Sequence, residues 1–305
     1  IGYNVHIIDN LSTGNKRLIP NKAKFTLCDI SDSKSISTIV KKNQFDILMH
    51  FAAYIDVEES MRHPKKYFEN NSDNSIKLLE ICRDSGLNNI IFSSTASTYG
   101  DIKHNNLISE KDDLNPINNY AKSKINVENY LLDNEENYKY IILRYFNVAG
   151  ADPDLRTGQV SKQSTHLIKI LSEVAVGKRD YIEIFGNDYN TADGTAIRDY
   201  IHVNDLANIH IQAAKLLLKT KKSQLFNCGY GRGYSVLEVI KETSKIIKKQ
   251  INYSYTKRRS GDVEKLVSDT SKIQKYINLQ LKNNNLNKII TTAIEWEKKI
   301  SEENI

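Results

Sequence analysis

The sequence predicts an α/β fold, a doubly wound parallel sheet of the kind that binds dinucleotides, with a smaller mixed α/β domain. Apolar strand-like runs alternate with helix-length segments through the first half of the chain, as βαβ units require. An early strand ends in Asp9, the position that in such sheets holds a ribose. A strand ending in Thr95 lies 25 residues before Tyr120, which opens an expected helix together with Lys124.

Each element follows from its local pattern. The first half alternates strands at Val5–Ile8, Phe25–Cys28, Ile47–Phe51, Ile90–Phe92 and Tyr140–Leu143 with helices near 33–43, 65–85 and 119–133. The second half is less regular, with helices near 166–177, 203–218, 236–249 and 286–300 and strands near 182–185, 225–228 and 252–256. Ser235 and Glu238 form a capping-box pattern that marks a helix start, and 282–287 is a polar loop.

Composition narrows the class of protein. A chain of 305 residues is long enough for one intimate pair of domains. Its net charge of +6 comes from scattered lysines, which favours a solvated basic surface over a nucleic-acid interface. No apolar run approaches the ~18 residues that span a bilayer, and three widely spaced cysteines suit a reducing compartment without a disulfide framework or a metal site. We expect a soluble cytoplasmic protein.

Tyr120 and Lys124 carry the strongest chemical signal. A phenol has a pKa near ~10, and a lysine one helical turn away lies on the same face and lowers that pKa by its charge. Spacing alone is weak, because Tyr99…Lys103 and Tyr253…Lys257 match it too. Only Tyr120 follows a proline-bearing loop at Pro116 and opens a helix. This context favours a site that removes a proton from an alcohol over a pair of surface residues.

Short motifs occur in order along nearly the whole chain. The most specific are Phe185–Tyr189 and Arg198–Val203. The others are Asp9–Gly14, Asp29–Ile30, His50–Ala53, Glu59–Ser60, Asn70–Asn71, Ser93–Thr95, Tyr99–Gly100, Tyr120–Lys124, Arg144–Gly150, Asp193–Thr195 and Arg259–Asp262. With these motifs the chain resembles the UDP-glucose 4-epimerases of the extended short-chain dehydrogenase/reductase family, whose sheet is of the Rossmann type.

The resemblance implies an isomerase of galactose metabolism that uses NAD. Tyr120 would take the proton of the sugar 4-hydroxyl while hydride passes to NAD, and the 4-keto sugar would turn and receive the hydride on its other face. Lys124 would lower the tyrosine pKa and bind the nicotinamide ribose, and Thr95 would bond the reacting oxygen. The reaction interconverts UDP-glucose and UDP-galactose, and a homodimer is expected.

The resemblance also implies which residues bind each ligand. NAD would contact Asp9, Asn10, Leu11, Ser12, Thr13, Gly14, Asp29, Ile30, Phe51, Ala52, Ala53, Asn71, Thr95, Tyr120, Lys124 and Phe146. UDP-sugar would contact Asn147, Leu167, Phe185, Arg198, Tyr200, Arg259, Asp262 and Leu266. The two arginines suit a diphosphate because a guanidinium can bind its oxygens bidentately. We expect residues 1–147 with 201–232 to bind NAD, and 148–200 with 233–305 to bind UDP-sugar.

Some positions depart from the family pattern. Ile55 stands where some members have a lysine, and His166 replaces a nucleotide-binding asparagine. His202 is interpreted as structural and His50 as a core histidine. Leu266 matches the position that closes the sugar pocket beside the 2-substituent, although it is almost as well interpreted as a core residue. Its intermediate size leaves plain and N-acetylated UDP-sugars both open as substrates.

The first strand, the glycine loop and the first helix of the fold do not occur in the printed chain, and Gly229–Gly233 has the wrong spacing to replace them. That strand is central in the order 3-2-1-4-5-6, so its loss leaves two interior edges unpaired. We therefore expect an N-terminally incomplete copy, short of roughly 30 residues. By itself it would be poorly soluble, bind little NAD and be inactive.

Two other functions compete with epimerisation. A nucleotide-sugar 4,6-dehydratase or a decarboxylase would share the fold and the Tyr–Lys pair. A dehydratase usually needs an Asp-Glu pair directly after the threonine, and here Thr95 is followed by Ala96 and Ser97. A non-catalytic NAD-binding protein on the same fold is the other alternative, but it would need none of Thr95, Tyr120 and Lys124.

Overall fold

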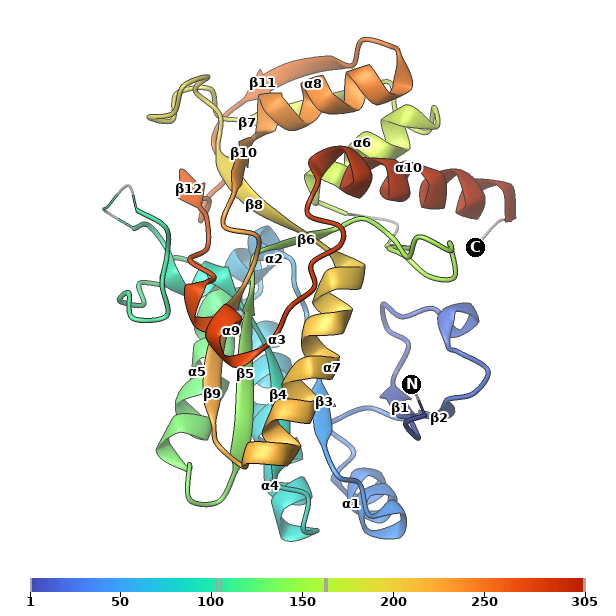
Figure 1. The fold of residues 1–305 in the computed structure, drawn as a ribbon, viewed down its shortest axis with the longest axis vertical. Helices are drawn as coiled ribbons and strands as arrows, with labels where there is room; N and C mark the ends of the chain where they lie inside the picture. Colours follow the sequence, from blue (N-terminus) through green and yellow to red (C-terminus); the bar gives the residue numbers. More distant parts are fainter. Residues whose placement is uncertain (1, 103, 105, 162–163, 304–305) are drawn as a thin grey trace. The chain divides into compact units, whose positions relative to one another are not determined.

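The computed structural model describes residues 2–102, 104, 106–161 and 164–303, and Figure 1 shows their fold. The chain forms two compact units. Unit 1 comprises Ile1–Ser94, Asn118–Ile142 and Ala214–Gln224, and unit 2 comprises Thr95–Ile117, Leu143–Ala213 and Leu225–Ile305. The predicted assignment of an NAD domain and a UDP-sugar domain stays a prediction. In the described part of the chain, no helix is both long and apolar enough to cross a bilayer.

Parallel strands and their crossover helices build unit 1. The strands are β1 (His6–Asp9), β2 (Lys24–Leu27), β3 (Leu48–His50) and β4 (Asn89–Thr95), of which β1 with β2 and β3 with β4 pair in parallel. The sheet order is β3-β4-β5-β9, where β5 (Lys139–Tyr145) and β9 (Gln224–Cys228) are each divided between the two units. The helices are η1 (Lys16–Leu18), α1 (Ser33–Asn43), α2 (Val57–Arg62), α3 (Pro64–Phe68), η2 (Glu69–Asp73), α4 (Asn74–Asp84) and α5 (Asn119–Asp133). This confirms the predicted α/β class.

β1 and β2 form a sheet of their own. They pair in parallel register from His6 opposite Lys24 to Asp9 opposite Leu27. Among the described residues, β1 pairs with β2 and β3 pairs with β4, and no strand joins the two sheets. The interior strand that the sequence analysis places between them stays a prediction.

Side-chain caps explain where the helices of unit 1 begin. Asp32 accepts a hydrogen bond from Ser35 N at 3.1 Å and starts α1, whose buried Ile36 packs in a core cluster with Leu78 of α4. Asn118 accepts from Ala121 N at 2.8 Å and starts α5. Both helices have the bounds that the sequence predicts, because Asp and Asn are strong N-caps.

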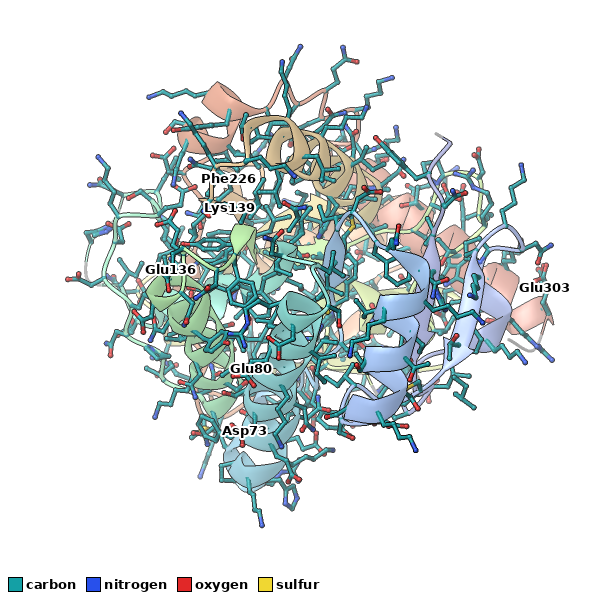
Figure 2. The ribbon with its side chains drawn as sticks, turned by 90° about the horizontal axis from the view of Figure 1, so that it is seen from below. Asp73, Glu80, Glu136, Lys139, Phe226 and Glu303 are labelled. Atoms are coloured by element: carbon teal, nitrogen blue, oxygen red, sulfur yellow. The ribbon has the colours of Figure 1, made fainter. Side chains whose placement is uncertain are left out.

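The helical segment predicted near 65–85 is confirmed, but it is not one regular α-helix. The chain instead forms α3, one π-helical turn (η2) and α4 in succession. Such a turn inserts an extra residue into the helix and is frequent at functional sites. Here it contains Asn71, whose amide bonds to the loop after β3. Figure 2 labels Asp73 and Glu80, which lie on η2 and α4 respectively.

Unit 2 is built around a strand that the sequence analysis missed. β8 (Ile197–His202) pairs with β6 (Asn147–Ala149), β10 (Gly233–Ser235) and β12 (Lys265–Leu266). β8 carries buried Arg198 and Asp199, which hide its apolar pattern, and its three partners are too short to show one. A second parallel sheet pairs β7 (Tyr181–Phe185) with β11 (Asn252–Thr256).

Three helices bury the core of unit 2. α6 (Leu167–Ala175), α8 (Val236–Ile247) and α10 (Leu286–Glu303) lie together in Figure 1 and share one apolar cluster with β7 and Tyr200. The remaining helices are η3 (Ala96–Tyr99), α7 (Val203–Thr220) and α9 (Ser271–Tyr276). The predicted capping box is confirmed, since Ser235 and Glu238 satisfy each other's backbone N–H groups at the start of α8.

Candidate functional site

The predicted base and its lysine lie on the first two turns of α5. Tyr120 is half-buried, and its carbonyl accepts a bond from the Ser123 hydroxyl at 2.7 Å. Lys124, one turn later, is only 2% exposed, and its ammonium lies 4.5 Å from the centre of the Phe92 ring on β4. The helix therefore places a tyrosine that solvent can still reach beside a cation that is buried in the protein. Lys103, from one of the alternative spacing matches, lies outside the described residues.

Burial controls the charge of Lys124. Removal from water lowers its pKa to about 7, while the carboxylate of Glu128, one turn further along α5, opposes that shift. Glu128 is fully buried and accepts a hydrogen bond from the hydroxyl of Ser94. A lysine with a pKa near neutrality responds strongly to an added negative charge. A phenolate at Tyr120 would favour the ammonium form of this lysine, and the ammonium would in turn favour the phenolate.

The loop after β3 is fastened to the π-helical turn. Asn71 is 1% exposed, accepts from Tyr54 N at 2.8 Å and donates to Tyr54 O at 2.9 Å. It also donates to the Ser123 hydroxyl on α5 at 3.2 Å. Phe51, by contrast, is 54% exposed, although it follows directly after a buried strand end. In unit 1, the hydrogen bonds of Asn71 therefore connect the start of α5 with the loop after β3, which contains the exposed Phe51.

Hydrogen bonds from its own side chains also hold the loop after β1 in shape. The carboxylate of Asp9 accepts from Leu11 N at 2.6 Å, and a side chain at Gly14 would come within 3.0 Å of that carboxylate. Asn10 donates to Asp29, at the end of β2, at 2.6 Å. These carboxylates stand at the carboxyl ends of parallel strands, where open α/β sheets bind nucleotides. The residues present thus fit the ribose end of a dinucleotide.

Arg198 and Asp262 form an ion pair in unit 2. The two terminal nitrogens of Arg198 also donate to carbonyls, at 2.9 Å to Ile197, 2.7 Å to Val263 and 3.3 Å to Glu264. Together these contacts occupy four of the five N–H donors of a guanidinium. In this arrangement Arg198 secures the segment before β12, and a diphosphate would have to displace protein acceptors to reach it bidentately.

Arg259, unlike Arg198, has a guanidinium nitrogen without a protein partner among the described residues. Its guanidinium lies 3.6 Å from the centre of the Phe185 ring at the end of β7. Its Nε is buried with no hydrogen-bond partner among the described residues, and so is the hydroxyl of Tyr189. A buried donor without a partner costs about 1–3 kcal/mol. A guanidinium held over a ring, with a buried Nε to which no described residue bonds, suits an anionic ligand.

The other predicted residues are distributed over both units. Thr95 ends β4 and caps η3, accepting from Ser97 N at 3.2 Å. In unit 2, Asn147 on β6 pairs in register with buried Tyr200 on β8. Phe146 and Leu266 share an apolar cluster, where Leu266 is 7% exposed, and Leu167 is the first residue of α6. Ile30 belongs to the core cluster of α1, and Ser12, Thr13, Ala52 and Ala53 lie in the loops described above.

Two histidines have the structural roles that the sequence analysis gave them. His50 is 3% exposed and bonds to Ser75 at 2.8 Å, which confirms a core histidine. Burial, and then the charge of Lys124, lower the pKa of His50 to about 3. His202 is fully buried, and its ring bonds to Thr292 at 3.1 Å.

The glycine cluster Gly229–Gly233 surrounds a buried carboxylate. Asp199 accepts from Tyr230 N and Gly231 N, each at 2.9 Å, and from Ser268 N at 3.2 Å. A side chain at Gly229 would come within 2.4 Å of that carboxylate. This turn binds a side chain of its own unit, which agrees with its rejection as a phosphate-binding loop.

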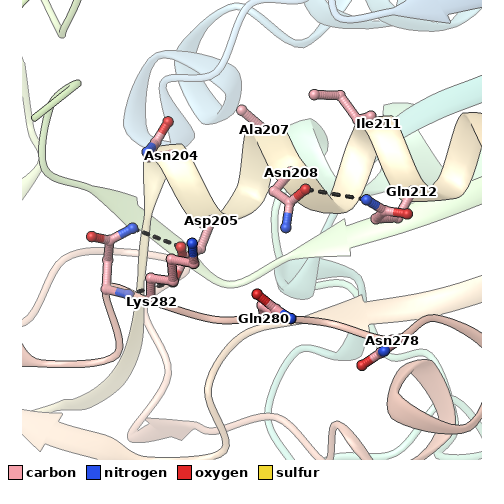
Figure 3. Close-up of a pocket in the computed structure, with 10 residues that line it drawn as sticks. Asn204, Asp205, Ala207, Asn208, Ile211, Gln212, Asn278, Gln280 and Lys282 are labelled. Atoms are coloured by element: carbon pink, nitrogen blue, oxygen red, sulfur yellow. Dashed lines mark hydrogen bonds between the residues drawn. The ribbon is translucent and has the colours of Figure 1, made fainter. Parts of the chain in front are cut away.

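A pocket of about 570 Å³ opens elsewhere in unit 2, between α7 and residues 278–283 (Figure 3). Most of its lining consists of amide side chains such as Asn204, Asn208 and Gln280. None of its lining residues belongs to the predicted NAD or UDP-sugar sites. The pocket therefore shares no residue with the predicted sites.

Strand-end carboxylates and a helix-borne Tyr–Lys pair on an α/β fold define a nicotinamide-dependent class of protein. The chain belongs to the NAD dependent epimerase/dehydratase family, whose model matches residues 1–229. This confirms the predicted family and NAD as its cofactor.

Several proteins to which the chain is similar are described as 4-epimerases. A UDP-glucose 4-epimerase from Lactobacillus helveticus is 40% identical over 299 residues, which cover 97% of this chain and 90% of that protein. The structure of a UDP-Glc/GlcNAc 4-epimerase from Campylobacter jejuni is 42% identical with a TM-score of 0.83, covering 98% of this chain and 93% of that one. A UDP-glucose 4-epimerase from Bifidobacterium longum, in complex with NAD⁺ and UDP, is 31% identical with a TM-score of 0.90, covering 98% and 92%.

Sequence reasoning missed Glu128 and the hydrogen bonds by which Asn71, itself a predicted site residue, holds Tyr54. Glu128 could have been found from its spacing, since it lies four residues after Lys124 on the same helix face. The bonds from Asn71 to Tyr54 leave no local signal, because they join segments 17 residues apart.

Proposed function

We propose that this protein interconverts UDP-glucose and UDP-galactose by oxidation and reduction at the sugar 4-position. The observation that carries the proposal is a half-buried tyrosine one helical turn before a buried lysine at the start of α5. NAD, when bound, supplies a reversible hydride acceptor. Tyr120 as phenolate removes the proton of the 4-hydroxyl, and it returns that proton when the 4-keto sugar is reduced on its other face.

The surrounding residues hold this chemistry in place. Lys124 stabilises the phenolate and binds the nicotinamide ribose, and Thr95 bonds the reacting oxygen. In unit 1, Asp9 and Asn10 bind the adenosine end, while Asn71 fixes the loop of Phe51 against which the cofactor lies. An exposed phenylalanine directly after a buried strand end supports this role, since an apolar ligand surface would cover it.

Unit 2 supplies the residues for the nucleotide sugar. Arg259 binds the diphosphate, because its guanidinium is held over the Phe185 ring and its Nε has no protein partner among the described residues. Asp262 accepts from the uridine ribose, and Arg198 holds Asp262 in place and reaches the diphosphate only by releasing protein acceptors. Leu167, Asn147 and Tyr200 complete the proposed site.

Activity on UDP-N-acetylglucosamine is the second candidate. It is favoured by the 42% identity to the Campylobacter jejuni protein described as acting on both UDP-Glc and UDP-GlcNAc. Leu266 is the proposed gate, and a leucine leaves more room than a tyrosine. Leu266→Tyr would lower activity on UDP-N-acetylglucosamine far more than on UDP-glucose if it is the gate. Equal losses would show that Leu266 only packs the core cluster that it shares with Phe146.

Isotope transfer tests the proposal directly. The full-length product of the gene, given UDP-galactose deuterated at carbon 4, should yield UDP-glucose that keeps the deuterium at carbon 4. Loss of deuterium to water would exclude a hydride held on the enzyme. A 4,6-dehydratase would release a 4-keto-6-deoxy sugar, and a non-catalytic NAD-binding protein would give no product. We also propose a homodimer in the cytoplasm, which sedimentation can test.

A further inference from the structure

Trp296 connects α10 to the loop before α6. It is the only tryptophan of the chain and is 3% exposed. Its indole Nε1 donates to the carbonyl of Gln159 at 3.0 Å. A side chain at Gly158 would come within 2.6 Å of the indole ring, so the backbone can approach the ring this closely only because a glycine stands there. The ring therefore fixes both the position and the direction of this loop.

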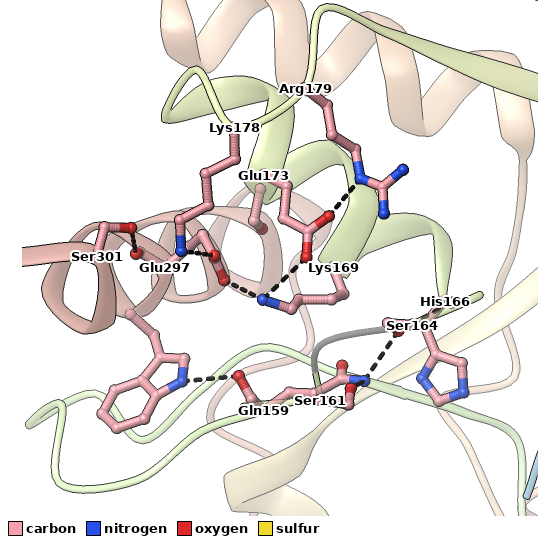
Figure 4. Close-up of polar contacts among 12 residues, drawn as sticks. Gln159, Ser161, Ser164, His166, Lys169, Glu173, Lys178, Arg179, Glu297 and Ser301 are labelled. Carbon is pink, nitrogen blue, oxygen red and sulfur yellow. Dashed lines mark hydrogen bonds and ion pairs between the residues drawn. The ribbon is translucent and has the colours of Figure 1, made fainter. Parts of the chain in front are cut away.

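Hydrogen bonds continue from this contact to the first turn of α6. The side-chain amide of Gln159 donates to the hydroxyl of Ser161 at 2.8 Å and to that of Ser164 at 3.0 Å. The Ser164 hydroxyl also accepts from the backbone N of His166 at 3.1 Å. His166 is the N-cap of α6 and Leu167 its first residue. A series of polar contacts thus leads from Trp296 to His166, the N-cap of α6, and Figure 4 shows the contact of Gln159 with Ser164.

The neighbour of Trp296 holds the body of the same helix. Glu297 is 1% exposed and forms ion pairs with Lys169 of α6 and, at 2.8 Å, with Lys178. Lys169 also lies 3.3 Å from Glu173 (Figure 4). Lys299, two residues past Glu297, donates to Leu155 O at 2.8 Å at the other end of the loop. Glu297 of α10 therefore holds the body of α6 in position. Trp296 positions the residues just before α6 through its bond to Gln159.

We propose that Trp296, acting through Gln159, is a positioning residue for the nucleotide: it presents the start of α6, with Leu167, to the uridine end of UDP-sugar. The proposal rests on the proposed function, because that function places UDP-sugar at Leu167. It goes further by assigning a role to two residues that are not in the predicted sites. The hydride chemistry lies at Tyr120 on α5, so this contact acts on nucleotide affinity and not on the rate of oxidation.

Trp296→Phe and Gln159→Ala in the full-length enzyme separate positioning from packing. The phenylalanine keeps an aromatic ring against Gly158 and removes the bond to Gln159 O. Losing one such hydrogen bond should raise the Kd for UDP, measured calorimetrically, and the KM for UDP-galactose by about three- to tenfold. kcat and the amount of bound NAD should stay at the wild-type level, because only uniform binding is lost. Lys298→Ala is the matched control, an exposed α10 lysine that should leave all four quantities unchanged.

The double variant tests whether the two residues act in series. If both act through Ser164 and His166, the double variant should weaken UDP binding by less than the product of the single effects. A Kd for UDP within about twofold of wild type in both single variants would overturn the proposal. A fall in kcat with unchanged KM would overturn it as well. Wild-type enzyme that binds UDP but fails to epimerise would contradict the proposed function alone, since the comparison of UDP affinities would still stand.

Discussion

The side-chain amide of Asn71 bonds both backbone polar groups of Tyr54, with its oxygen 2.8 Å from Tyr54 N and its nitrogen 2.9 Å from Tyr54 O. The backbone N–H and C=O of this loop residue are thus both bonded, as they would be in a strand that pairs with a neighbouring strand. The π-helical turn at Glu69–Asp73 contains the asparagine that makes these bonds. The irregular helix is therefore part of how the loop after β3 is shaped.

Asn71→Ala should destabilise the protein and reduce the NAD that it retains. The substitution leaves the N–H and C=O of Tyr54 without partners, which costs about 2–4 kcal/mol. Urea unfolding and the ratio of bound NAD to protein measure the two effects. Asn74→Ala, three residues further along the same helical stretch, is the control and should change neither. Full NAD retention in Asn71→Ala would show that the loop keeps its shape without this amide.

The two arginines of unit 2 should respond differently to removal. Arg259→Ala breaks no protein hydrogen bond among the described residues, so the free energy of unfolding should change by less than about 1 kcal/mol. Its KM for UDP-galactose should rise about 10- to 100-fold through loss of charge-assisted bonds. Arg198→Ala removes the ion pair of Asp262 and leaves the carbonyl of Val263 without this donor, and it should cost about 1–3 kcal/mol of stability. Equal stability of the two variants would contradict the roles assigned here.

His50 should make the protein sensitive to acid. Its pKa is about 3 in the folded protein against 6.5 in the unfolded chain, so below pH 6.5 only the unfolded form takes up the proton. Folding stability is complete above pH 6.5 and should fall by about 1.4 kcal/mol per pH unit as the pH drops toward 3. Denaturant titrations of wild type and His50→Gln at several pH values measure this. A wild-type curve no steeper than that of the variant would refute the prediction.

Lys124→Ala should lose both rate and cofactor. The substitution removes the cation that favours the phenolate at Tyr120, and it removes the proposed contact to the nicotinamide ribose. kcat should fall at least about 100-fold and the bound NAD should decrease. Lys122→Ala changes an exposed lysine two residues earlier on α5 and should behave as wild type. Unchanged NAD content with reduced kcat would limit Lys124 to the proton transfer.

Local signals explain what could be predicted from the sequence. The start of α5 could be predicted because its signals are local: Pro116 lies just before it, and Asn118 caps it by a bond within three residues. β8 was missed because its Arg198 and Asp199 look like surface charges, and they are buried only because Asp262 and Ser268 satisfy them from far along the chain. The roles of Trp296 and Asn71 likewise depend on long-range contacts. Contacts with residues far away in the sequence determine how these segments fold, and no short stretch of sequence contains both partners.

Turnover of UDP-galactose by the Tyr120→Phe variant tests the central claim most directly. Phenylalanine keeps the ring and removes the hydroxyl that the account assigns as the base. The variant, compared with wild type at equal NAD occupancy, should epimerise UDP-galactose about 10²- to 10⁴-fold more slowly. It should bind UDP and NAD as wild type does, because the hydroxyl anchors neither. Turnover near the wild-type rate would contradict the assignment of Tyr120 and the mechanism built on it.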